Sequence, residues 1–194
     1  VQCNRCFYIF FAASFFAVNA IVAQEKSVIQ VPGRTKTTVI NPNGISILPS
    51  GRYVAPVGKV SMITHDPFGL TISPDGSKAV SLHNGVFTIF YLDKDSMVRV
   101  PDYNKTIASP FTKGSLLGAS FHKDNQTVFL SGGDNGTVIA YDCVKLRVVD
   151  TFSLDGAIGD KIFQDSFTSD LIYNATGNEL LVLDQANYRL VRID

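Results

Sequence analysis

Cysteine, a residue type that often carries metal or redox chemistry, is scarce in this sequence. Cys3 and Cys6 are separated by two residues, a spacing that can suit a metal ion or a redox-active disulfide. Both lie at an apolar N-terminus with the layout of a targeting segment, so we disfavour such a site there. Cys143 is the one cysteine that follows, which excludes an intramolecular disulfide once that segment is removed.

Recurring aspartates are a second candidate for chemistry. Asp93, Asp142 and Asp194 stand 49 and 52 residues apart, each close to the end of a strand-like run. Three carboxylates at one repeated position could be imagined as a cluster. Their place in the repeat instead favours hydrogen bonds from the backbone of the following turn to the side chain.

The histidines and one glycine-rich run complete the candidates. His65, His83 and His122 occur at no spacing typical of a metal site, and we interpret each as a loop or turn residue. Residues 131–136 join two strand-like runs and open no helix, so we interpret them as a flexible hairpin loop rather than a phosphate cradle. No nucleophile elbow, zinc-protease, P-loop or dinucleotide pattern occurs. The sequence therefore assigns no catalytic, cofactor-binding or metal-binding residue and predicts no cofactor.

The N-terminus predicts export. Residues 7–18 form an apolar run of 12 residues that follows a basic residue and precedes small ones, as in a secretory signal peptide. Cleavage after Ala20 or after Ala23 fits, and we favour Ala23, which makes residues 1–23 the signal peptide. A retained anchor is the alternative, since about 18 mostly apolar residues approach the lower limit for a membrane span. Cleavage predicts a periplasmic or extracellular protein without membrane attachment.

Composition and periodicity predict one all-β domain after the signal. The chain has 194 residues with 17 basic and 17 acidic side chains, and a net charge of zero argues against a nucleic-acid binder. Runs rich in Val, Ile, Phe, Tyr and Thr repeat with a period nearer two than 3.6. Of the acidic residues 15 are Asp, which favours turns, and two are Glu, which favours helices.

An internal repeat predicts the architecture. A short apolar strand runs into a tight turn three times, and the turn residues Gly76, Asn125 and Gly177 stand 49 and 52 residues apart. All three are residue types that tolerate positive φ. Four strands joined by turns, at about 50 residues per unit, are typical of a propeller blade.

Two stretches resemble a known family. Residues 67–78, which read PFGLTISPDGSK, resemble the repeats of YVTN-type, YncE-like bacterial β-propellers. Residues 43–58 resemble the leading hairpin of a subgroup in which an exported seven-bladed propeller often precedes an alkaline-phosphatase-like phosphoesterase domain. The resemblance covers about residues 41–194 and fades in the third unit, where Asn-Ala-Thr-Gly replaces Ser-Pro-Asp-Gly. It implies that the partners are the remaining blades and a C-terminal domain.

The expected fold is an all-β, partial β-propeller, with about three blades of the seven that the resemblance implies. Residues 24–40 are expected to be a linker, 41–60 a hairpin, and 61–194 three blades, the third without its outer strand. Closed propellers need roughly four to eight blades, so we expect a longer protein. The hairpin either completes the closing blade or packs freely on the first blade. Strands are expected near residues 68–72, 78–82, 86–92, 97–100, 118–122, 127–131, 137–142, 146–152, 170–174, 179–183 and 188–193.

Three classes of function remain open. The leading hypothesis is a noncatalytic segment of a larger exported bacterial protein that acts as a scaffold or recognition surface, with a phosphoesterase domain to follow. The second is an enzyme with its site in the propeller channel, as in lactonases with similar blades. The third is a standalone surface-binding propeller. Neither nucleic acid nor a membrane is an expected partner of the processed chain.

Signal cleavage is directly testable. We expect N-terminal sequencing of exported material to begin at Gln24, because the pattern Ile-Val-Ala precedes that residue. Recovery of an intact N-terminus at Val1 in the membrane fraction would instead indicate the retained anchor.

Overall fold

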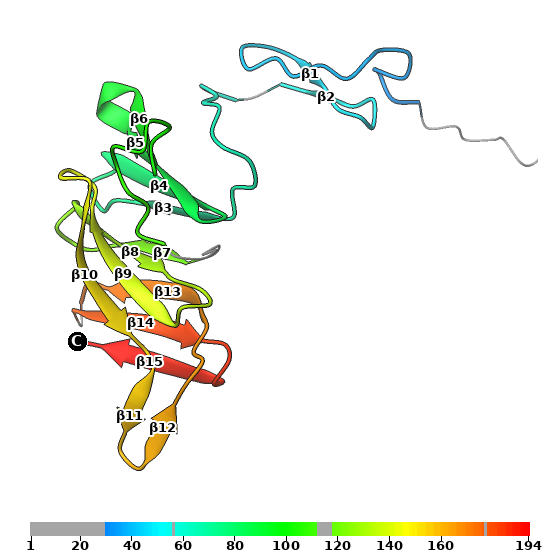
Figure 1. Cartoon of the computed structure of the whole chain (residues 1–194). Helices are drawn as coiled ribbons and strands as arrows, with labels where there is room; N and C mark the ends of the chain where they lie inside the picture. Colours follow the sequence, from blue (N-terminus) through cyan, green and yellow to red (C-terminus); the bar gives the residue numbers. More distant parts are fainter. Residues whose placement is uncertain (1–29, 56, 112–117, 177) are drawn as a thin grey trace, which may run out of the picture. The chain divides into compact units, whose positions relative to one another are not determined.

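The computed structural model of the chain describes residues 30–55, 57–111, 118–176 and 178–194. Within these ranges every regular element except one is a β-strand, so the predicted all-β class is confirmed (Figure 1). The exception is the 3-10 turn η1 (Leu92–Lys94). The predicted signal peptide, residues 1–23, lies outside the described residues. No helix in the described ranges is long and apolar enough to cross a bilayer.

The chain divides into two compact units, of which the first extends to Met62. Its described part contains a hairpin of β1 (Ser46–Ile47) and β2 (Tyr53–Val54), which falls within the hairpin predicted from the sequence. Val39, in the stretch expected to be a linker, forms an antiparallel bridge with Ile47. The first unit therefore includes more than the hairpin itself.

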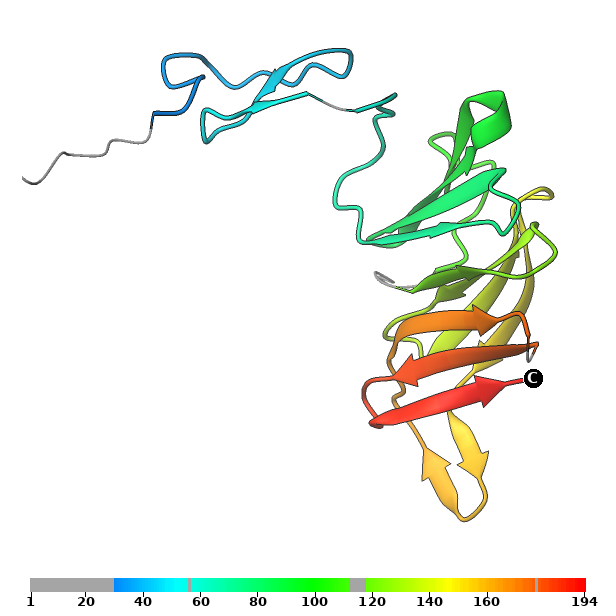
Figure 2. The same cartoon turned by 180° about the vertical axis from the view of Figure 1, so that it is seen from behind.

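Besides one two-stranded hairpin, the second unit contains three antiparallel sheets of three or four strands, in which strands adjacent in sequence pair with each other (Figures 1 and 2). Their eleven strands lie within two residues of the positions expected from the sequence. The first sheet consists of β3 (Gly69–Ile72), β4 (Lys78–His83), β5 (Val86–Tyr91) and β6 (Ser96–Val100); the second of β7 (Ala119–Phe121), β8 (Thr127–Ser131), β9 (Thr137–Asp142) and β10 (Arg147–Ser153); and the third of β13 (Thr168–Asn174), β14 (Glu179–Asp184) and β15 (Arg189–Ile193).

Positive-φ residues close the repeated turns after β3 and β7. Gly76 (φ 73°) and Asn125 (φ 60°) hold this conformation as predicted, whereas Gly177 lies outside the described residues. In each turn the carboxylate of Asp75 or Asp124 accepts backbone N–H groups two or three residues on. The backbone N–H of Asp75 donates to the side-chain oxygen of Asn125 (2.9 Å), which ties the two turns together.

Successive sheets pack face to face around apolar cores. We call the side of a sheet that faces the next sheet along the chain its forward face, and the opposite side its backward face. The first core joins the forward residues Val80, Leu82, Phe87, Ile89 and Val100 of the first sheet to the backward residues Phe121, Val128, Leu130, Ile139, Tyr141 and Cys143 of the second. The second core joins the forward residues Phe129, Val138 and Phe152 of the second sheet to the backward residues Leu171, Leu180 and Val182 of the third.

The first strands of the three sheets approach one another, with β7 in contact with both β3 and β13. Gly118, just before β7, permits the close approach to the third sheet. A Cβ atom at this position would lie 2.9 Å from the Cα of Asp170, which is closer than real Cβ contacts occur. Glycine is therefore required here for packing rather than for a turn.

The connection between the second and third sheets holds a hairpin that the sequence did not predict. β11 (Gly156–Ile158) and β12 (Lys161–Phe163) pair with each other, and Gly159 (φ 60°) lies in the turn between them. The hairpin projects past β15 (Figure 2). Each strand has three residues and lies outside the repeat that indicated the equally short β7, which explains the omission.

The glycine-rich run at residues 131–136 joins β8 to β9, as predicted, and it packs closely against its surroundings. Its three glycines are buried: Gly132 lies against Thr137 of the same hairpin, whereas Gly133 and Gly136 contact the segment that enters the third sheet. The backbone N–H of Gly133 donates to Oγ1 of Thr168 (2.8 Å). A Cβ at Gly136 would lie 2.8 Å from the carbonyl oxygen of Ser166, so these glycines serve close packing.

Two tyrosines at the first core provide a test of this packing. The Tyr91 hydroxyl donates to the carbonyl oxygen of Cys143 (2.6 Å), whereas the Tyr141 hydroxyl is buried and has no partner among the described residues. We expect Tyr141→Phe to raise the free energy of unfolding by about 1 kcal/mol, because it removes an unpaired buried hydroxyl. Tyr91→Phe should lower it by about 1 kcal/mol. Urea denaturation measures both changes, and a loss of stability in Tyr141→Phe would contradict the expectation.

Candidate functional surfaces

No group of side chains in the described ranges is placed to hold a metal ion. His122 occupies the turn position of Ser73, as predicted, since the backbone N–H of each donates to the carbonyl five residues on. His83 is not a loop residue, because β4 extends one residue further than expected and includes it, buried. Its Nδ1 lies 3.1 Å from the carbonyl oxygen of His65 and its Nε2 lies 3.3 Å from Oγ1 of Thr88. Burial lowers the pKa of His83, which keeps the ring neutral at pH 7.

The recurring aspartates do not share one position. Asp142 ends β9, and its Oδ1 accepts the backbone N–H groups of the next two turn residues at 2.8 Å, so the predicted turn role is confirmed there. Burial opposes ionisation of Asp142, but these hydrogen bonds outweigh burial and lower the pKa of the carboxyl group.

Asp93 does not occupy the position of Asp142, because Tyr91 is the β5 residue equivalent to Asp142. The longer turn between β8 and β9 causes this shift, and in the described part of the chain Asp93 makes no side-chain hydrogen bond. Asp194 pairs with Arg192 at 3.4 Å.

A charged cluster that sequence reasoning missed joins the third sheet to the segment before it. Asp184, at the end of β14, is buried and accepts Nε–H of Arg189 across the turn (2.8 Å). Nδ2 of Asn187 and the backbone N–H of Phe167 donate to the same carboxylate at 3.0 and 3.1 Å. The Arg189 guanidinium lies over the ring of Phe163 in β12, 3.7 Å from its centroid.

The Asp184 cluster, which comprises Asp184, Asn187 and Arg189, stabilises the fold and is unsuited to proton transfer. Burial alone would raise the pKa of Asp184, but the bonds from Arg189 and Asn187 outweigh it and lower the pKa to about 2. The carboxylate therefore stays ionised at neutral pH, with its oxygens occupied by protein donors. Asp184 and Arg189 are direct cross-strand partners. Opposite charges at the two ends of a predicted turn are therefore the sequence signal that could have indicated this ion pair.

The forward face of the third sheet is apolar and open. Ile172, Leu183 and Leu190 are 62%, 46% and 61% exposed. Together with Leu181 they line a hollow of about 300 Å³. Isolated exposed apolar residues are ordinary on a protein surface, but a contiguous group marks a contact surface.

The backward face of the first sheet is open in the same way. Leu70 and Ile72 of β3 are 70% and 56% exposed, and Met97 of β6 is 49% exposed. The register places these side chains on the face opposite to the first core. Apolar side chains are thus exposed at both ends of the stack of three sheets.

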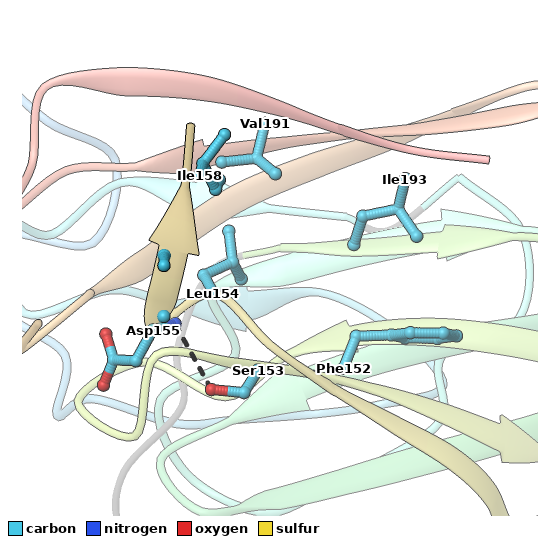
Figure 3. Close-up of a pocket in the computed structure, with 9 residues that line it drawn as sticks. Phe152, Ser153, Leu154, Asp155, Ile158, Val191 and Ile193 are labelled. Carbon is cyan, nitrogen blue, oxygen red and sulfur yellow. Dashed lines mark hydrogen bonds between the residues drawn. The ribbon is translucent and has the colours of Figure 1, made fainter. Parts of the chain in front are cut away.

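A groove runs between the end of β10 and the edge strand β15 (Figure 3). It encloses about 340 Å³, with Phe152 and Leu154 on one side and Val191 and Ile193 on the other. Ile158 of β11 also lines it. In the described residues β15 pairs with β14 alone, whereas the equivalent strands β5 and β9 each pair with a fourth strand. The groove therefore lies beside an unpaired strand edge.

Two solved structures are distantly similar to this chain. No protein-family model and no curated protein sequence matches the chain. Its structure is similar to the structure of U3-55K, with 13% identity and a TM-score of 0.45, covering 66% of this chain and 39% of that chain. It is also similar to hydrazine synthase of Kuenenia stuttgartiensis, with 14% identity and a TM-score of 0.40, covering 71% of this chain and 38% of that chain. The chain spans less than half the length of either, and these likenesses identify neither a family nor a function.

The structural role of the Asp184 cluster can be measured. We expect Arg189→Ala or Asp184→Asn to lower the free energy of unfolding by about 3 kcal/mol, because each leaves a buried charge without its partner. Arg192→Ala is the matched control in the same strand, since its ion pairs to Glu179 and Asp194 are solvent-exposed and span 3.4 Å. It should cost less than about 1 kcal/mol. Denaturant titration provides the values, and equal losses at Arg189 and Arg192 would contradict the assigned role.

Proposed function

We propose that the chain is a noncatalytic β-propeller segment of an exported bacterial protein and that it serves as a scaffold or recognition surface. The observation that carries this proposal is a repeated meander whose forward face packs on the backward face of the next one. Four-stranded sheets repeated radially about a central channel are the blades of propellers. The mutual approach of β3, β7 and β13 is consistent with placing these first strands nearest the channel.

The open surfaces support membership of a ring. The apolar faces at the two ends of the stack are the surfaces that neighbouring blades would cover. A fourth strand paired with β15 would fill the groove of Figure 3 and complete the third blade. In the family that the sequence resembles, seven blades close the ring, and further sheets of this repeat would supply the cover.

The noncatalytic role is supported by what the charged and titratable groups do. The carboxylate of Asp142 fixes a turn, the Asp184–Arg189 pair joins two segments, and His83 is buried beside a carbonyl oxygen. Each of these groups is engaged by the fold itself. The family resemblance adds that a phosphoesterase domain accompanies the segment in the complete protein, and that both function outside the cytoplasm.

Activity assays test the noncatalytic role. We expect the purified chain to hydrolyse p-nitrophenyl phosphate, bis-p-nitrophenyl phosphate and an aliphatic lactone no faster than a heat-denatured sample, because Asp142, Asp184 and His83 are engaged by the fold and no group of side chains in the described ranges is placed to hold a metal ion. Circular dichroism of the same sample confirms that it is folded. Saturable turnover of either phosphate ester would overturn the noncatalytic role, and turnover of the lactone would favour the channel enzyme.

A further inference from the structure

A hollow of about 300 Å³ lies where turns of the first and second sheets meet. The start of β4 and the turn between β5 and β6 form most of its wall, and the turn between β9 and β10 adds one residue. Its lining residues are Ser77, Lys78, Tyr91, Asp93, Lys94 and Val144. Both sides belong to described sheets, so no further blade is needed to form the hollow. A volume of this size suits a small molecule.

Two hydrogen bonds fix the shape of the hollow. The backbone N–H of Leu92 donates to the carbonyl oxygen of Ser77 (2.9 Å), which ties η1 to the residue before β4. The Tyr91 hydroxyl donates to the carbonyl oxygen of Cys143 (2.6 Å), which ties the end of β5 to the turn that carries Val144. The walls are therefore preorganised, and a ligand would not have to order them on binding.

Two lysines give the hollow its charge. Lys78 is half-buried, and its Nζ donates to Oγ of Ser77 (3.1 Å), whereas an ammonium group has three hydrogens to donate. The ion pairs among the described residues include neither Lys78 nor Lys94. Asp93 is the one acidic residue of the lining, so the lining has a net charge of +1. This arrangement favours an anion as the missing partner.

The strand register shows that the basic character is particular to the first sheet. Lys78 and Tyr91 are direct cross-strand partners at the end of β4 and β5. The other two sheets carry no basic residue at these two positions and have at least one acidic residue there: Thr127 and Asp142 in the second sheet, Glu179 and Asp194 in the third. The first sheet therefore reverses the charge that the repeat places at this end.

We propose that this hollow binds a small organic anion through the ammonium groups of Lys78 and Lys94. A phosphate or a carboxylate group supplies the acceptor oxygens for these donors. The ring of Tyr91 and the side chain of Val144, which is 54% exposed, provide contacts for the apolar part of the ligand. The inference rests on the recognition role in the proposed function and gives that role a ligand class.

Calorimetric titration of the purified chain tests the ligand class. Phenyl phosphate and benzoate carry the two kinds of oxyanion group on the same apolar ring, and benzamidine is a cation of similar shape. We expect saturable binding of at least one of the anions, weakened by added salt, and no binding of benzamidine. Whether phenyl phosphate or benzoate binds more tightly distinguishes a phosphate from a carboxylate ligand. Failure of both anions to bind, or equal binding of benzamidine, would overturn the inference.

Charge variants test the assigned residues. Lys78→Gln should weaken binding about 10-fold, because it removes the half-buried charge and keeps a polar side chain. Asp93→Asn should strengthen binding, because it removes the like charge from the lining. Lys123→Gln, at an exposed lysine in the turn between β7 and β8 and outside the hollow, is the matched control and should bind like the unchanged chain. Equal losses in Lys78→Gln and Lys123→Gln would show nonspecific attraction and overturn the site.

Substitution of Tyr91 tests the argument from the register. Tyr91→Asp introduces opposite Lys78 the carboxylate that the second sheet carries, so it should abolish binding by pairing with Lys78. Tyr91→Phe loses the same hydroxyl without adding a charge and should retain binding. Circular dichroism confirms folding of every variant, and undiminished binding in folded Tyr91→Asp would contradict the role of Lys78. Release of phosphate from phenyl phosphate would overturn the noncatalytic role instead, whereas absence of binding leaves that role unaffected.

Discussion

A sheet with two apolar faces needs two neighbours, and this requirement organises the second unit of the chain. In β9 the five residues after the first are all buried, because the second sheet lies between two others. In β15 no residue is fully buried, because the third sheet has a neighbour on its backward face alone among the described residues. The same kind of strand thus shows continuous burial or alternation according to how many of its faces are covered.

The sheets repeat, whereas the connections between them do not. The first connection contributes Phe111 to the core between the first and second sheets. The second contributes Leu154 to the next core and then forms the β11–β12 hairpin, which the Asp184–Arg189 pair holds through Phe163. The repeated sheets therefore pack through apolar contacts that any similar sheet can make. The hairpin in the second connection is instead held by polar contacts that require particular partners.

The sequence predicted the features that depend on local pattern. Alternation located the eleven strands of the three sheets, and residue types that tolerate positive φ located the turns at Gly76 and Asn125. Features that depend on tertiary contact were not predicted. Gly133 contacts Thr168, His83 is buried at a strand end, and Asp93 is out of register with Asp142 because one turn is longer. The division of each sheet into a forward and a backward face likewise required the observed register.

The burial of Cys143 in the first core has a chemical consequence. Thiolate is the reactive form of cysteine, and burial raises the pKa of this thiol to about 12. With the first two sheets in contact, Cys143 is shielded from oxidants and from alkylating reagents, even in a compartment that favours disulfides. Only separation of those sheets gives access to it, so the rate of thiol labelling reports how often this one interface opens.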